Sequence, residues 1–337
     1  MTESAILKKL RAMWAQGRLA CVGLDSDIES PDFPAHLTPL ANPVAAVLTF
    51  NEAIIKATAK VAGMFKPNEQ FYRKLGAEGA RVLIDTFAML HRHAPQAVKI
   101  LDAKPGDIGN SNKGTIKFAF KDCGADAITL NPYMGAHFDP DPAKCDGLQN
   151  FLECADRGVI VLCRTSNKGA GWLQDRLTVV SEAEMFQDFG ISVALAEEFC
   201  NKGAWYRLAS GPGSYLIPFY QLVALTVDRK WNKNGNCALV IGANNPKQLK
   251  LVRELCPDIP FLNPAFGKQM EGEENIVKQT IFAGLDSQGG GMICNNSRKA
   301  VFASKGTDFA EAAAAFVQKF SDEIAGFRAD WLEASKQ

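Results

Sequence analysis

Short apolar runs that end in polar or charged residues recur eight times along the chain. They lie at residues 19–24, 63–68, 97–101, 125–130, 158–163, 237–241, 259–262 and 291–294. Apolar residues at helical spacing occupy much of the chain between them, over 43–62, 78–91, 111–121 and 145–156. Short buried strands that alternate with helices are typical of a parallel α/β sheet. Eight such strands predict an α/β fold, a closed (β/α)8 TIM barrel, with an N-terminal helix over 1–14 and a last helix over 309–327.

The interval between the fifth and sixth strands is longer than one loop and one helix. Residues 165–236 contain a glycine-rich piece at 168–171, a helical pattern over 181–199, a turn at 211–214 and a second helical pattern over 217–231. We interpret this interval as a mobile lid followed by an insertion. Because no linker-like composition marks a boundary, and barrels of this length often form one domain, the whole chain is predicted to be a single domain.

Composition and motif spacing argue against several classes of function. The 37 Lys and Arg residues balance the 37 Asp and Glu residues, and there is no basic tract, so nucleic acid is not an expected partner. No apolar run reaches about 18 residues, so no membrane span is expected, and the N-terminus lacks the apolar block and cleavage site of a signal peptide. The nine cysteines form no C-x-x-C pair, and the four histidines show no ligand spacing with them. These features predict a cytoplasmic protein with reduced thiols and no metal.

Charged residues gather where the predicted strands end. Asp25 follows the first strand, Lys66 lies in the second, and the third leads into Asp102 and Lys104. These last two side chains share one face of an extended chain because side chains alternate with a period of two, and Asp107 follows the Pro-Gly turn. An isolated Asp-x-Lys is most often a solvated ion pair that contributes little. Active sites of (β/α)8 barrels lie at the carboxyl ends of the strands, so polar ends on nearly every strand favour a site that holds a cation between anions.

The last two strands end in loops that suit a phosphate. Glycine and small polar residues stand beside a cation in 264–269, after the seventh strand, and in Ser297-Arg298, after the eighth. Barrels often bind phosphate on these two loops, and the planar guanidinium of Arg298 can contact a phosphate at two points. The alternative for Arg298 is an ordinary surface or capping arginine. The chain has no P-loop and no dinucleotide-binding glycine fingerprint, so neither nucleoside triphosphate hydrolysis nor NAD chemistry is expected.

Taken in order, these motifs resemble the orotidine 5'-phosphate decarboxylase family. The matching segments are V-G-L-D ending at Asp25, F-K-P-N around Lys66, D-x-K-x-x-D-I-G-N from Asp102, R-T-S-N from Arg164, V-I-G-A-N from Val240, Pro264 to Gln269, and Ser297-Arg298. They extend from about residue 20 to residue 304. F-K-P-N followed by D-x-K-x-x-D-I-G-N is specific in combination. The pattern is most similar to the longer branch found in many bacteria and some protozoa.

The resemblance implies decarboxylation of orotidine 5'-phosphate to UMP and CO2, the final step of de novo pyrimidine synthesis, without a metal or an organic cofactor. In the roles that the family implies, Lys104 stabilises and then protonates the C6 carbanion, Asp102 lies beside the departing carboxylate, and Lys66 completes the charged chain. A positioned ammonium in a water-poor site stabilises developing negative charge, and nearby carboxylates keep it protonated. Asp107 and Ile108 reach the neighbouring subunit's site, which implies a homodimer with a shared active site.

The family also implies a set of substrate-binding residues. They are Asp25, Asn68, Ile108, Ser111, Thr165, Ser166, Pro264, Gly267, Gln269 and Arg298. Within this set, Asp25 is expected at the ribose hydroxyls and Ser166 at the pyrimidine edge. Gln269 is expected to bridge toward the phosphate, which Arg298 holds.

Three departures from the family pattern and two rival functions stay open. Phe266 and Lys268 are bulkier than is usual after the seventh strand, Ser111 stands where a threonine is common, and the segment 205–231 is longer than in short forms. One rival is a decarboxylase or aldolase on the same barrel that acts on a sugar phosphate with Mg2+. It needs an added acidic metal ligand, and no extra Glu stands at the strand ends. The other rival is a silent barrel that binds a nucleotide monophosphate, against which the intact charged motif argues.

Overall fold

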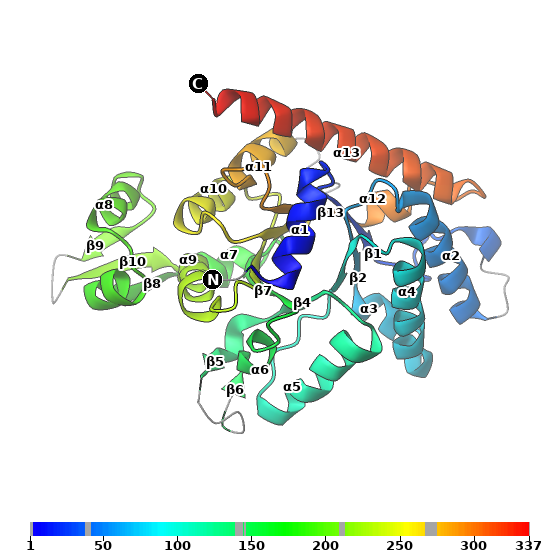
Figure 1. The fold of residues 1–337 in the computed structure, drawn as a ribbon, viewed down its shortest axis with the longest axis horizontal. Coiled ribbons are helices and arrows are strands. Elements are labelled where there is room, and N and C mark those ends of the chain that lie inside the picture. Colours follow the sequence, from blue (N-terminus) through cyan, green and yellow to red (C-terminus); the bar gives the residue numbers. More distant parts are fainter. Residues whose placement is uncertain are drawn as a thin grey trace.

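Eight parallel strands close into a barrel in the computed structural model, which describes residues 3–37, 42–138, 144, 146–208, 213–266 and 275–336 (Figure 1). The strands are β1 Ala20–Leu24, β2 Met64–Pro67, β3 Val98–Leu101, β4 Ala127–Leu130, β7 Gly158–Arg164, β11 Cys237–Ile241, β12 Phe261–Asn263 and β13 Met292–Asn296. Their order around the barrel is β1-β13-β12-β11-β7-β4-β3-β2, and β1 closes it by pairing with both β13 and β2. The predicted (β/α)8 barrel is therefore confirmed, and every strand lies where the hydrophobic pattern placed it.

Helices surround the barrel, with the long C-terminal helix running past α11 and α2 (Figure 1). The longer ones are α1 Ala5–Ala15, α2 Pro43–Thr58, α4 Gly79–His93, α5 Gly109–Ile116, α8 Val193–Asn201, α9 Phe219–Leu225, α10 Pro246–Leu255, α11 Ile276–Gly284 and α13 Phe309–Ala334. The short ones are α3 Glu69–Arg73, α6 Gln149–Leu152, α7 Ala170–Gln174 and α12 Arg298–Val301. Wider π-helical turns over Lys117–Asp122 and Thr226–Trp231 continue α5 and α9. None of the helices in the described ranges is long and apolar enough to cross a membrane.

Local sequence explains where several helices begin. The side chain of Asn42 accepts a hydrogen bond from the Val44 N–H at 2.9 Å, and Pro43 occupies the first turn of α2, the position at which proline costs a helix no hydrogen bond. Ser4 caps α1 in the same way, through the N–H of Leu7. The helices predicted over 1–14, 43–62, 78–91, 111–121, 217–231 and 309–327 are confirmed as α1, α2, α4, α5, α9 and α13, although their ends shift.

Two predicted helices differ from the structure. The prediction of one continuous helix over 181–199 was wrong. Strand β8, Leu177–Ser181, ends there, a short helical stretch that is π-helical over Glu184–Asp188 follows, and Val193–Asn201 forms a separate α-helix. Gly190 takes a positive φ of 64° that separates the two helical pieces, and the Ser192 hydroxyl caps the second. The helix predicted over 145–156 shortens to α6, and Cys145 lies outside the described residues.

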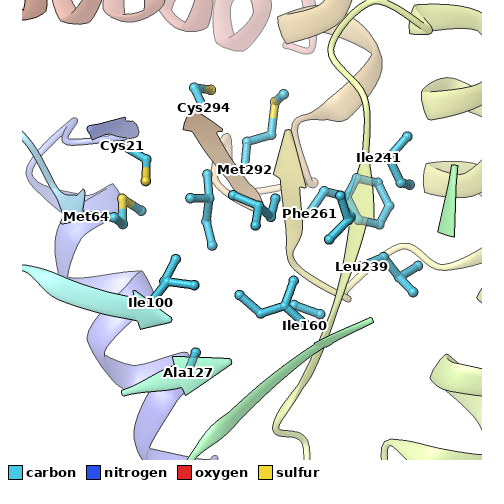
Figure 2. Close-up of a cluster of buried hydrophobic side chains, with 14 of the residues drawn as sticks. Cys21, Met64, Ile100, Ala127, Ile160, Leu239, Ile241, Phe261, Met292 and Cys294 are labelled. Carbon is cyan, nitrogen blue, oxygen red and sulfur yellow. The ribbon is translucent and has the colours of Figure 1, made fainter. Parts of the chain in front are cut away.

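Buried apolar side chains from all eight strands pack inside and around the barrel (Figure 2). The outer face of the sheet, under the helices, buries Leu239, Ile241, Phe261, Met292 and Cys294. Cys21, Met64, Ile100, Ala127 and Ile160 face the barrel interior. Because strand side chains alternate, the residues two and four places further on share this inward face. On β3 this alternation places Asp102 on the same inward face as Ile100. The same strands that make an apolar interior thus become charged toward their carboxyl ends.

Helix α1 closes the opposite, amino end of the barrel. Ile6 and Leu10 line a residual gap of only about 10 Å³ beneath the apolar interior, and the Trp14 indole donates a hydrogen bond to the Met292 carbonyl at 2.8 Å. Such a gap has no room for a ligand. Access to the interior is consequently from the carboxyl end.

The insertion between β7 and β11 forms a small antiparallel sheet that projects from the barrel at the left of Figure 1. Its strands lie in the order β8, β10 and β9, with β9 at Tyr206–Leu208 and β10 at Ser214–Pro218. Tyr215 and Ile217 of β10 are buried beneath it. The predicted insertion is present, but its strands were not predicted. A two-stranded pair, β5 Ala136–His137 with β6 Asp146–Gly147, follows β4.

Candidate active site

A cavity of about 660 Å³ opens at the carboxyl ends of the barrel strands. Its wall consists of Asp25, Asp32, Lys66, Asn68, Asp102, Lys104, Thr129, Leu162, Thr165, Ser166, Asn167, Gln174, Val240, Leu262, Pro264, Ala265, Phe266, Asn295, Asn296, Ser297, Arg298, Lys299 and Phe302. All eight barrel strands or the loops that follow them contribute to this list. A cavity of this size accommodates a small organic ligand such as a nucleotide.

Two lysines and one aspartate form the centre of the cavity. The Lys66 ammonium lies 2.6 Å from Asp102 Oδ2, and the Lys104 ammonium lies 2.5 Å from Asp102 Oδ1. Lys66 and Asp102 are almost completely buried, whereas 42 % of the Lys104 side chain is exposed. The carboxylate is therefore shared between a buried cation and one that faces the open cavity.

Strand pairing fixes the position of Asp102. Its N–H donates to the Pro67 carbonyl at 2.9 Å, and its own carbonyl accepts from the Glu69 N–H at 3.2 Å. The Thr129 hydroxyl on β4 donates to Asp102 Oδ1 at 2.8 Å. Sequence reasoning missed Thr129. The signal for it was the alternation along β4, which places Thr129 on the same inward face as Ala127.

The backbone at Lys104 is in a conformation that is uncommon for a residue with a side chain. Its φ is +56°, in the left-handed region, and its N–H donates to the Thr129 carbonyl at 3.0 Å and lies 3.2 Å from the Thr129 hydroxyl. A left-handed non-glycine residue costs energy and persists where the surroundings hold it, often at functional sites. Here this backbone conformation directs the Lys104 side chain into the cavity, where its ammonium contacts Asp102.

In the Lys66–Asp102 pair, charge pairing has a larger effect on the two pKa values than burial has. Burial by itself raises the pKa of Asp102, but the ammonium groups of Lys66 and Lys104 and their hydrogen bonds hold this pKa well below its usual range. Burial likewise acts to lower the pKa of Lys66, and the carboxylates of Asp102 and Asp25 instead raise it above the usual value. Both groups therefore stay ionised at neutral pH.

The pKa of Asp25 is shifted in the opposite direction from that of Asp102. Burial raises its pKa, Lys66 opposes the rise, and the negative charge of Asp102 adds to it. The Oδ1 atom of Asp25 is buried and has no hydrogen-bond partner in the described parts of the chain. A buried acceptor without a donor is costly, so a ligand hydroxyl is the natural group to satisfy it.

The other predicted site residues divide into three groups. Asn68, Thr165, Ser166, Pro264 and Arg298 line the same cavity as the charged centre. Asp107, Ile108 and Ser111 do not: they are exposed at the start of α5, where the Asp107 carboxylate accepts a hydrogen bond from the Ile108 N–H at 2.7 Å. Gly267, Lys268 and Gln269 lie outside the described residues. Sequence reasoning also missed Gln174, Asn295 and Asn296 as cavity residues.

The described wall of the cavity offers three carboxylates to a divalent metal. No cluster of three or more His, Cys, Asp and Glu side chains that suits a metal ion occurs in the described ranges. Besides Asp102, the carboxylates in the wall are Asp25 and Asp32, and both oxygen atoms of Asp102 already contact ammonium groups. Those ammonium groups compete directly with a cation for the carboxylate.

A parallel barrel whose open end holds a lysine–aspartate–lysine array in a ligand-sized cavity defines a (β/α)8-barrel enzyme. Within that class, the model of the orotidine 5'-phosphate decarboxylase / HUMPS family matches residues 20–196. The chain belongs to this family.

Relatives match over nearly the whole chain. The orotidine 5'-phosphate decarboxylase of Janthinobacterium sp. (strain Marseille) is 38 % identical over 319 residues, which cover 94 % of this chain and 97 % of the relative. That of Cellvibrio japonicus is 35 % identical over 321 residues, 95 % of this chain and 98 % of the relative. The structure of Leishmania donovani OMP decarboxylase is similar with a TM-score of 0.68 and 29 % identity, covering 96 % and 98 % of the two chains. The structure of Leishmania donovani UMP synthase has a TM-score of 0.69 and 29 % identity; the match covers 97 % of this chain but only 57 % of that one.

Proposed function

We propose that this protein removes CO2 from orotidine 5'-phosphate to form UMP in pyrimidine biosynthesis, without a metal or an organic cofactor. The named activity of relatives that match over more than nine tenths of the chain supports the reaction. The observation that carries the mechanism is the Lys66–Asp102–Lys104 array at the centre of the cavity.

In the proposed reaction, the bond between C6 and the carboxylate carbon breaks, CO2 leaves, and the electron pair stays on C6. The Lys104 ammonium stabilises this negative charge because it is held in place before the reaction begins. Lys104 then gives a proton to C6 and regains one from water. Asp102 orients the Lys104 ammonium, and the buried ion pair with Lys66 holds Asp102.

We assign the remaining contacts according to the place of each residue in the cavity. The unpartnered oxygen of Asp25, with Lys66 and Asn68, suits the ribose hydroxyls. Arg298 suits the phosphate and Ser166 the base. Thr165 and Pro264 line the same wall, while Gly267 and Gln269 remain predictions from the resemblance.

The direct test follows the ultraviolet absorbance of orotidine 5'-phosphate with the purified wild-type protein and with Lys104→Ala. We expect turnover that is insensitive to EDTA, and a loss of at least about 10³-fold in kcat in the variant. Lys336→Ala, at the exposed C-terminal end of the described chain, serves as the matched control and should not change turnover. Activity that disappears in EDTA and returns with Mg2+ supports the sugar-phosphate rival instead. Full activity in Lys104→Ala contradicts the mechanism.

We further propose a homodimer in which Asp107 and Ile108 complete the site of the second copy. Both side chains are exposed outside their own cavity, and 48 % of Ile108 is accessible. Mixing Asp107→Ala and Lys104→Ala chains is expected to restore part of the activity, because each mixed dimer contains one site with neither substitution and one site with both. Absence of recovery after verified subunit exchange contradicts the shared site.

Three expectations from the sequence stay proposals. They are a single domain over the whole chain, a lid within residues 165–236 and a cytoplasmic location. Limited proteolysis, hydrogen exchange with and without UMP, and cell fractionation test them in that order.

A further inference from the structure

The side chains of Arg164 and Asp175 tie the end of β7 to the C-terminal end of α7. Arg164 is the last residue of β7, and its guanidinium contacts the Asp175 carboxylate through two hydrogen bonds of 2.7 and 2.9 Å. A third guanidinium N–H donates to the Thr165 carbonyl at 2.8 Å. Only 8 % of Arg164 is exposed. Paired arginine–carboxylate contacts fix geometry as well as charge, so the segment after β7 has a defined position relative to α7.

Gln174 contacts the same segment from inside the cavity. Its side-chain oxygen accepts from the Thr165 N–H at 2.8 Å, and its amide nitrogen donates to the Thr165 hydroxyl at 2.8 Å. The Thr165 hydroxyl has one proton to give, and its shortest contact as a donor is Asn167 Oδ1 at 2.6 Å. The hydroxyl of Thr165 is thereby occupied inside the protein.

The loop after β11 holds the other side of this segment. The Gly242 N–H donates to the Arg164 carbonyl at 2.8 Å, and the Asn244 amide donates to the Ser166 carbonyl at 3.1 Å. A side chain on Gly242 would place its Cβ 2.9 Å from Ser166 Cα, closer than two such atoms approach. The backbone of 164–166 is therefore held from both sides.

Ser166 is the group left available in this arrangement. It is half-buried, it lines the cavity, and no other described residue forms a hydrogen bond with its hydroxyl. A hydroxyl both donates and accepts, which suits the alternating C=O and N–H groups on the edge of a pyrimidine base. Arg298, the cation suited to phosphate, follows β13, whereas Ser166 follows β7.

We infer that Gln174, together with the Arg164–Asp175 pair, is a positioning unit that holds Thr165 in place and thereby sets the Ser166 hydroxyl to bind the base of the nucleotide. The unit strengthens binding of the base and does not change binding of the phosphate. This inference rests on the proposed function only in taking a pyrimidine nucleotide as the ligand. A group that is held in place before binding loses less conformational freedom on binding, and this is the advantage such a unit provides.

The test compares two ligands that differ by the base. UMP and ribose 5-phosphate are titrated calorimetrically into the wild-type protein, Gln174→Ala, Gln174→Glu and Asp175→Ala. We expect Gln174→Ala to weaken UMP binding about tenfold or more, because the half-buried amide makes two hydrogen bonds to Thr165. It should change ribose 5-phosphate binding by less than about twofold. Gln174→Glu keeps the acceptor for the Thr165 N–H and should recover part of the loss. In turnover of orotidine 5'-phosphate, KM should rise more than kcat falls.

Gln288→Ala is the matched control, since Gln288 is exposed in the loop that leads into β13 at the amino end of the barrel. Equal weakening of both ligands, or unchanged UMP binding, in Gln174→Ala with an unchanged melting temperature overturns the inference alone. Should Asp175→Ala fail to fold, the two Gln174 variants still decide. A wild-type protein that binds ribose 5-phosphate and UMP equally well also overturns it, and one that fails to turn over orotidine 5'-phosphate contradicts the proposed function.

Discussion

Strand β3 carries a buried lysine near its amino end and a buried aspartate just past its carboxyl end, and the two surroundings are organised differently. Lys99, 1 % exposed, directs its ammonium to the carbonyls of Ala97 and Pro95, at 2.8 and 3.2 Å. Asp102 meets two ammonium groups below an open cavity.

The Lys99 region is also ionic, because Asp126 lies beside it. Its carboxylate accepts from the Lys99 backbone N–H at 2.9 Å and pairs with the Lys9 ammonium on α1 at 2.6 Å. Every one of these contacts is internal to the protein, and α1 leaves only a small gap at this end. Buried charge alone therefore does not mark a site. The Asp102 region differs because a cavity adjoins the accessible ammonium of Lys104 and an Asp25 carboxylate oxygen that has no partner among the described residues.

The largest expected difference is between Asp102→Asn and Asp126→Asn. Asp102→Asn removes the charge that orients Lys104, so we expect kcat to fall by about 10²–10³-fold or more. Asp126→Asn should leave kcat within about threefold while lowering the free energy of unfolding. Turnover and urea denaturation of both variants measure the two effects. Equal losses of activity mean that the two regions do not differ in function.

The lowered pKa of Asp102 gives that comparison a pH dependence. A carboxyl group whose folded pKa is depressed stabilises the protein above the unfolded value, about 3.9, and this contribution disappears as pH falls through the folded pKa. The stability difference between wild type and Asp102→Asn should therefore be constant from about pH 5 to 8 and shrink below about pH 4. A difference that grows on acidification contradicts the ion pairs around Asp102.

The next largest effect is on the free energy of unfolding, which Lys66→Met should lower more than Lys99→Met. Lys66→Met removes a charged partner of buried Asp102 and should cost about 1.5–3 kcal/mol in the free energy of unfolding. Lys99→Met replaces a buried charge whose ammonium contacts two carbonyls and, within the described ranges, no carboxylate. We expect no loss beyond about 1 kcal/mol, or a gain. Urea denaturation at pH 7 measures both.

Alkaline pH separates the two lysines further. Carboxylates raise the pKa of Lys66 despite its burial, so its contribution is complete below the unfolded value, about 10.4, and is lost as pH rises through the folded pKa. Burial lowers the pKa of Lys99, so stability associated with Lys99 increases as pH rises through that lowered value. Stability curves for the two Met variants against wild type should move in opposite directions. Parallel curves contradict this difference.

The smallest effect is expected for Lys9→Ala. Its ammonium pairs with Asp126, but about half of the Lys9 side chain is exposed, at 49 %. Exposed pairs contribute about 0–1 kcal/mol and weaken in salt, so the variant should lose less than about 1 kcal/mol and no activity. Denaturation at low and high salt checks this value, and a loss of several kcal/mol would show that the amino end depends on that pair.

Much of the fold could be predicted because barrel strands are short, apolar and locally recognisable. All eight have the predicted positions, and the strand-end rule led to Asp25, Lys66, Asp102 and Lys104 in one cavity. The strands of the insertion were missed because Leu177 and Val179 are exposed while Val180 is buried, a short pattern that a helix interpretation also accommodates. Thr129 and Gln174 were missed because each acts through a residue that is not its neighbour in the sequence. Thr129 bonds to Asp102, and Gln174 bonds to Thr165 across a turn.

Local sequence pattern was enough to locate the eight barrel strands and the inward face of each at its carboxyl end, because alternation is a local property of an extended chain. The three-dimensional arrangement was needed to show that Lys66, from β2, and Lys104, after β3, share the carboxylate of Asp102 with Thr129 of β4. Those contacts depend on the register of neighbouring strands and on closure of the barrel. Both are set by packing across the whole sheet, which no local pattern encodes.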